Sequence, residues 1–252
     1  MTPYIGITGF CSRSEVDAVL AALPANPNRQ LMCGALLSNA LLSGEPSDAP
    51  NRCPAPDAIA GIFSDDPRCL NLVHYRPPPG ANLADALARA TEVGGPHCHG
   101  VQINATRGAP WPDLDALAAY RECCRPSRIV FQAGREAMES VNHRPDELAR
   151  RCATYSGLVT DVLVDASEGL GLSLDAARSA DYLEALRAAA PELGLVVAGG
   201  LHSGNISELL SPLLPEWSGV SIDAEGRLRD ADDHLNTSAA IAYLQAASQL
   251  LD

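Results

Sequence analysis

The sequence predicts a single-domain (β/α)8 barrel that spans residues 1–252. Eight short apolar runs recur along the chain, and most of them are nearly continuous, as expected for parallel strands that are buried on both faces. The segments between the runs place apolar residues three and four positions apart, which is the helical period. Regular alternation of strands and helices predicts a parallel sheet, and eight such units match the count and length of a closed barrel.

The competing architecture is a doubly wound open sheet. Its Gly-x-Gly-x-x-Gly fingerprint does not follow the first apolar run, so the barrel is preferred. The eight expected strands are 4–8, 31–37, 69–75, 100–104, 128–132, 161–165, 193–199 and 219–223. The expected helices are 16–23, 82–92, 113–124, 144–155, 174–190 and 237–251, the first of them preceded by a possible capping box, Ser12-Arg13-Ser14-Glu15.

The net charge of −13 argues against nucleic acid and anionic membranes as partners. The N-terminal segment MTPYIGITGF lacks the basic region of a signal peptide, and no run is long enough to span a bilayer. The eight cysteines are dispersed without a C-x-x-C pair, which favours reduced thiols in a cytoplasmic protein. We expect no cofactor and no metal, a small phosphorylated substrate as the partner, and a monomer or a homodimer.

A long segment after the second strand stands apart. Residues 38–56 (SNALLSGEPSDAPNRCPAP) are rich in Pro, Ser, Asn and Asp. In a barrel this loop lies on the face that carries the active site, where it is either a lid over the site or a tolerated surface insertion.

Polar residues gather where the apolar runs end. The carboxyl ends of barrel strands surround the active site, and polar side chains that point inward there cost free energy unless they find partners or a ligand. We therefore expect a substrate-binding ring at this end, and its members are Thr8, Ser38, His74, Arg76, Gln102, Asn104, Gln132, Asp165, Gly199, Gly200 and Asp223.

Two members of the ring are candidates for proton transfer. Asp165 ends a run of Val, Leu and Val, so it is the first candidate for a general acid, although it could instead cap the loop that follows. Asp223 ends the last strand in a similar way, but Asp-Ala-Glu-Gly also reads as a plain turn. Cys11, just past the first strand, is a candidate base or an inert packing residue, and His74 and Asp223 are the other choices for the base.

Glycine-rich loops follow two neighbouring strands. Gly199 and Gly200 lie at the exit of a buried strand, ahead of a helix start expected at Ser203–Asn205. Gly169 and Gly171 occupy the loop one unit upstream. Paired glycines let the backbone approach an anion closely, and the N–H groups at a helix start point toward it. We therefore expect phosphate between these loops, held by Gly169, Gly171, Gly199, Gly200, Ser203 and Asn205.

Several of these segments resemble phosphoribosylanthranilate isomerase, a barrel enzyme of tryptophan biosynthesis. The similar segments are Tyr4-Ile5-Gly6-Ile7-Thr8 (family K-I-C-G-I-T), Val101-Gln102-Ile103-Asn104 (V-Q-L-H), Leu163-Val164-Asp165 (the strand of the catalytic aspartate), Glu168-Gly169-Leu170-Gly171 (G-G-T-G), Ala198-Gly199-Gly200-Leu201 (A-G-G-L) with Asn205, and Ser221-Ile222-Asp223 (V-D-V-S-S-G). The likeness spans most of the chain and is clearest from residue 158 onward.

The chain departs from the family pattern at four places, one of which is the loop at residues 168–171, where two of the family's three glycines are kept. Ile5 stands where the family has its strand-one cysteine, the general base; Asn104 replaces a histidine; and Ala224-Glu225 replaces a serine pair. The resemblance implies the barrel fold, a phosphate site and Asp165 as the acid. The expected activity is an aldose–ketose (Amadori-type) isomerisation of a phosphoribosyl amine, with Cys11 moving in as the base. The alternatives are other chemistry on a phosphorylated small molecule and a non-catalytic barrel that binds a metabolite or a partner.

Overall fold

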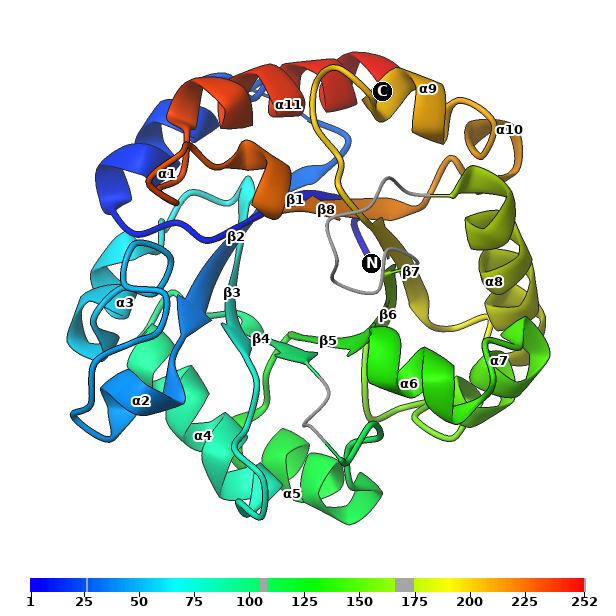
Figure 1. The fold of residues 1–252 in the computed structure, drawn as a ribbon, viewed down its shortest axis with the longest axis horizontal. Helices are drawn as coiled ribbons and strands as arrows, with labels where there is room; N and C mark the ends of the chain where they lie inside the picture. The colour runs from blue at the N-terminus through cyan, green and yellow to red at the C-terminus, as the bar shows by residue number, and fades with distance from the viewer. Residues whose placement is uncertain (26, 105–107, 166–174, 252) are drawn as a thin grey trace.

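The computed structural model describes residues 1–25, 27–104, 108–165 and 175–251. Eight parallel strands close into a barrel in sequential order, β1 to β8, and β8 pairs with β1 (Figure 1). The predicted (β/α)8 fold is therefore confirmed. The strands are β1 (Tyr4–Thr8), β2 (Gln30–Leu37), β3 (Cys69–Tyr75), β4 (Gly100–Asn104), β5 (Arg128–Ala133), β6 (Asp161–Asp165), β7 (Gly194–Ala198) and β8 (Ser221–Ala224).

Helices form a ring around the outside of the strands (Figure 1). They are α1 (Arg13–Leu20), α2 (Asn39–Leu42), α3 (Pro56–Ile62), α4 (Leu83–Gly94), α5 (Leu114–Cys124), α6 (Arg135–Ser140), α7 (Pro145–Ala153), α8 (Ala176–Ala189), α9 (Ile206–Leu210), α10 (Leu214–Trp217) and α11 (Thr237–Leu251), with a 3-10 turn at Gly226–Leu228. None of the helices in the described residues is both long and apolar enough to cross a membrane.

Two helix starts show how the sequence sets local structure. The capping box at α1 is present: the Ser12 hydroxyl accepts a hydrogen bond from the Glu15 N–H, and the Glu15 carboxylate accepts one from the Ser12 N–H. Asp113 caps α5 by accepting a hydrogen bond from the Ala116 N–H at 2.8 Å. These side chains satisfy N–H groups that have no partner within the helix.

The segment after β2 contains more helix than the sequence predicts. Residues 39–42 form α2, and α3 begins at Pro56, the last residue of the expected loop. Proline suits the first turn of a helix because its missing N–H has no partner there in any case. Both helices are too short for an apolar period to reveal them.

The barrel core has two layers, separated by the strands. Alternate strand residues pack outward against the helices, as Ile5 and Ile7 of β1 do. The opposite set fills the interior, where its apolar members form one buried cluster of Tyr4, Met32, Leu70, Leu72, Val130, Leu163 and Val196. The middle of the barrel is thus solid, and polar side chains lie above and below this cluster.

An ion pair closes the bottom of the interior, at the amino ends of β5 and β6. The Arg128 guanidinium donates two hydrogen bonds to the Asp161 carboxylate, at 2.6 and 2.8 Å, and both side chains are buried. Arg128 also donates to the Thr2 carbonyl and stacks over the ring of Tyr4. A Cβ on Gly194 would come within 2.1 Å of the Asp161 carboxylate, so glycine leaves the space that this pair needs.

We expect Arg128→Met to lower the free energy of unfolding by about 3–5 kcal/mol, because it leaves the Asp161 carboxylate buried without its cation. Chemical denaturation monitored by circular dichroism measures the change. Arg144→Met is the matched control, since the Arg144–Asp146 pair is exposed and its loss should leave the free energy of unfolding nearly unchanged. Equal losses of stability for the two substitutions would show that the buried Arg128–Asp161 pair contributes no more than the exposed pair.

Candidate functional site

Seven polar side chains face the barrel interior at the carboxyl ends of the strands. Strand alternation places each of them inward, above the apolar cluster, and hydrogen bonds that join non-neighbouring strands confirm the placement. We call them the inner polar ring: Thr8, His74, Gln102, Asn104, Gln132, Asp165 and Asp223. The sequence places all seven at strand ends; five of them are buried, and Asn104 and Gln132 are half-buried.

Asp223 is a buried carboxylate of the ring with three hydrogen bonds from its neighbours' side chains. Thr8 donates from its hydroxyl to both carboxylate oxygens at 3.2 Å, and the Gln102 amide donates to Oδ2 at 3.1 Å. Burial raises the pKa of Asp223 to about 7, and the nearby Glu225 carboxylate adds to the increase. A carboxyl group with this pKa can hold or release a proton at neutral pH.

A chain of amides connects Asp223 with Asp165. The Gln102 Nε2 group, which donates to Asp223, also lies 3.4 Å from the Gln132 Oε1 acceptor. Gln132 in turn places its own Nε2 at 3.5 Å from the Asp165 carboxylate. Two buried carboxyl groups on β6 and β8 are thus linked by side chains of β4 and β5. A substrate at the mouth of the barrel could meet one carboxyl group on each side.

His74 and Asn104 form a second unit of the ring. Their side chains meet at 2.9 Å, Asn104 Nδ2 to His74 Nε2, and the other ring nitrogen of His74 is buried without a hydrogen-bond partner. Burial lowers the pKa of His74 to about 4, with Arg76 adding to the decrease, so the imidazole is neutral at pH 7. The buried Oε1 of Gln102 also has no partner. Unpaired buried polar atoms in this ring are what a bound substrate would satisfy.

Other predicted ring members lie apart. Arg76 is exposed, and its backbone carbonyl accepts a hydrogen bond from Asn39. Ser38 is half-buried and precedes α2. Neither side chain forms a hydrogen bond or ion pair with a residue of the inner polar ring.

The glycine pair after β7 has the expected backbone freedom. Gly199 and Gly200 have φ of 131° and 57°, values that favour glycine. Asn205 shapes the loop, because its side chain accepts from the His202 N–H and donates to the Gly200 carbonyl. Helix α9 begins at Ile206, just after the expected start, and Ser203 is exposed. Gly169 and Gly171 lie outside the described residues, so the expected phosphate site is described only on its β7 side.

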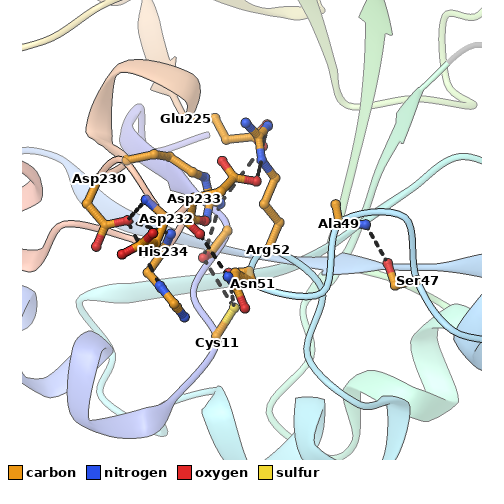
Figure 2. Close-up of polar contacts among 12 residues, drawn as sticks. Cys11, Ser47, Ala49, Asn51, Arg52, Glu225, Asp230, Asp232, Asp233 and His234 are labelled. Atoms are coloured by element: carbon orange, nitrogen blue, oxygen red, sulfur yellow. Dashed lines mark hydrogen bonds and ion pairs between the residues drawn. The ribbon is translucent and has the colours of Figure 1, made fainter.

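Cys11 lies in a separate cluster of loop residues (Figure 2). Its thiol is 3.5 Å from the carbonyl oxygen of Asn51 and 3.8 Å from that of Gly9. Burial raises the pKa of the Cys11 thiol to about 11, with the Glu15 carboxylate adding to the increase. The thiol is therefore protonated at neutral pH, and the structure does not bring it together with Asp165 or Asp223.

The same cluster joins the segment after β2 to the segment after β8. Arg52 donates to Asp233 at 2.6 Å and to Glu225 at 3.1 Å, and the Asn51 amide donates to the Asp232 carbonyl (Figure 2). Arg229 lies almost fully buried at the base of the cluster and donates to the Gly9 and Asp233 carbonyls. Sequence reasoning missed this cluster, because its members come from three distant segments and share no motif.

The comparisons with known proteins identify the fold. No family model and no curated protein matches the chain. Among solved structures, phosphoribosyl anthranilate isomerase from Thermus thermophilus has a TM-score of 0.65 at 16% identity and covers 98% of this chain and 99% of its own. The chain has the fold of phosphoribosylanthranilate isomerase.

Two further structures support this conclusion. Monomers of the dimeric enzyme from Thermotoga maritima match with a TM-score of 0.64 at 12% identity, covering 98% of this chain and 100% of theirs. A phosphoribosyl anthranilate isomerase in complex with reduced 1-(o-carboxyphenylamino)-1-deoxyribulose 5-phosphate matches with a TM-score of 0.65, 12% identity and the same coverage. Such low identities establish the architecture and leave the reaction open. The expected resemblance is confirmed at the level of fold.

The raised pKa of Asp223 predicts a specific pH dependence of stability. Between its ordinary value of 3.8 and about 7, the folded protein holds a proton that the unfolded chain has released. The contribution of Asp223 to the free energy of unfolding therefore falls as pH rises through that range. His74 acts in the opposite sense, because its lowered pKa makes stability rise with pH between about 4 and 6.5.

We expect Asp223→Asn to gain stability relative to the wild type as pH increases from about 4 to 7, by a few kcal/mol in total. Urea denaturation at several pH values measures the difference. Asp65→Asn, at a side chain that is 76% exposed, is the control for the loss of one carboxylate from the chain. A difference for Asp223→Asn that did not vary with pH would show that Asp223 titrates normally.

Proposed function

We propose that this protein is an isomerase that carries out an aldose–ketose (Amadori-type) rearrangement on a phosphoribosyl amine, with Asp165 as general acid and Asp223 as general base. The observation that supports the proposal most strongly is the pair of buried carboxyl groups linked through Gln102 and Gln132 at the mouth of the barrel. The solved relative with a deoxyribulose 5-phosphate derivative bound supports a phosphorylated sugar as the substrate class.

The rearrangement needs one proton donor and one proton acceptor. A proton from Asp165 to the ring oxygen opens the sugar, and the nitrogen lone pair forms the C1–N double bond. Asp223 then removes the proton from C2, the electrons of that C–H bond form a C1–C2 double bond, and the π electrons of the C1–N double bond return to nitrogen as its lone pair. Protonated Asp223 then gives its proton to C1, and the Asp165 carboxylate accepts the hydroxyl proton at C2 as the ketone forms, so both carboxyl groups return to their starting states. The electrons stay within the substrate, so no redox partner is required.

Asp223 suits the role of base better than the alternatives. With a pKa of about 7 it is ionised in half or more of the molecules at and above neutral pH, and a base of this strength is well matched to working pH. The Cys11 thiol, with a pKa of about 11, is protonated and directed at backbone carbonyls. His74, with a pKa of about 4, is a weak base. Cys11 and His74 remain available for binding or packing roles.

The phosphate group would lie beside the β7 loop. Gly199 and Gly200 present backbone without side chains there, and Ser203 is exposed at the same loop. The net charge of the chain does not oppose this assignment, because backbone N–H groups supply local positive potential.

Asp165→Asn and Asp223→Asn should each lower kcat on N-phenyl-phosphoribosylamine by on the order of 10²-fold or more, because each removes a positioned proton-transfer group. The wild-type kcat/KM should rise with pH through about 7 as Asp223 ionises, and Asp223→Asn should lose this limb. Steady-state kinetics measure both. Wild-type rates for both variants would exclude the acid–base pair, and phosphate-ligand binding without turnover in the wild type would favour a non-catalytic barrel.

A negative charge introduced at the β7 loop tests the proposed phosphate site. Ser203→Asp should weaken the binding of inorganic phosphate by roughly fivefold, because a carboxylate a few ångströms from the anion repels it by about 1 kcal/mol. Calorimetric titration measures the affinity. Ser211→Asp, at an exposed position beyond α9, is the matched control and should bind as the wild type does. Equal affinities for the two variants would place the phosphate elsewhere.

A further inference from the structure

A cavity of about 170 Å³ lies beside the inner polar ring, between the segment that precedes α4 and the segment that precedes α5. The two helices are neighbours on the outside of the barrel (Figure 1). The walls of the cavity are mostly apolar and include Pro77, Pro78, Leu83, Ile103, Trp111 and Pro112. Asn104 is the link to the ring, because it lines the cavity and its side chain also contacts His74.

The aromatic wall of this cavity is held in a fixed position. The Trp111 ring lies 5.7 Å from the ring of Phe131 and 6.3 Å from that of Tyr155. Its indole N–H donates to the Ser140 hydroxyl at 2.9 Å. Three prolines form much of the remaining wall, and proline has a fixed φ. A pocket with walls that are already ordered costs little entropy when a ligand binds.

The size and polarity of the cavity limit what can enter. A dry cavity of about 150 Å³ is large enough for benzene, so this one fits a single six-membered ring. The charged side chain among the described lining residues is Asp113, a carboxylate that also caps α5. An anionic ring would meet like charge there, whereas a neutral ring would not.

We propose that this cavity is a specificity pocket for one uncharged six-membered ring carried by the substrate. The inference rests on the proposed function, in which a sugar amine reacts at the inner polar ring and its substituent extends past Asn104. The pocket favours a substituent without a carboxylate, because Leu83, Trp111 and the prolines surround the ring and Asp113 repels a negative group.

The test uses aniline, which is neutral at pH 7, and 4-aminobenzoate, which has the same ring with a carboxylate. Ligand-observed NMR titration of the whole protein should give a millimolar dissociation constant for aniline and binding at least tenfold weaker for 4-aminobenzoate. Leu83→Trp, which fills the cavity, should weaken aniline binding at least tenfold. Leu114→Trp is the matched control, since Leu114 begins α5 as Leu83 begins α4 but lies outside the cavity and is 40% exposed.

Asp113→Asn provides a second, independent test that keeps the helix cap, because asparagine is as good an N-cap as aspartate. It should bring the affinity for 4-aminobenzoate close to that for aniline. Equal aniline binding by Leu83→Trp and Leu114→Trp, or wild-type affinity for 4-aminobenzoate as high as for aniline, would overturn the proposal. Aniline binding does not require turnover and should survive Asp223→Asn, so a failure of the acid–base mechanism remains distinguishable from a failure of this pocket.

Discussion

Closure of the eight parallel strands is the constraint on which the rest of this structure depends. Because side chains alternate across each strand, closure sends every second residue into a shared interior. Apolar residues fill the middle, the Arg128–Asp161 pair fills the bottom, and the polar ring is left at the top. The contact between Gln102 on β4 and Asp223 on β8 exists only because the sheet is closed.

The electrostatics of the site follow from this packing. Asp223 lies above an apolar cluster and contacts hydroxyl and amide groups that carry no charge, so its ionised form is poorly solvated and its pKa rises. The same burial keeps His74 neutral. The ring therefore offers carboxyl groups for proton transfer and neutral groups for hydrogen bonding, an arrangement suited to moving protons within one substrate.

Each loop around the inner polar ring offers a different kind of contact to a substrate. The segment after β2 is tied to the segment after β8 by Arg52, which holds it beside the mouth of the barrel. The segments after β3 and β4 enclose the apolar cavity. The loop after β7 offers the glycine pair. Phosphate, reacting carbons and substituent would thus meet different parts of one rim, as is usual for barrels in which strand-end loops carry specificity.

The sequence by itself determined the strands and the rim. Four of its eight predicted strands, 4–8, 69–75, 100–104 and 161–165, coincide with the observed ones, because continuous apolar runs are a strong local signal. It also placed Asp165, Asp223 and their polar neighbours at strand ends. Only the tertiary structure decided that Asp223 carries the raised pKa, that Cys11 faces backbone carbonyls, and that Arg52 meets Glu225 and Asp233. These outcomes depend on contacts between segments far apart in the chain, and periodicity and motifs report only on near neighbours.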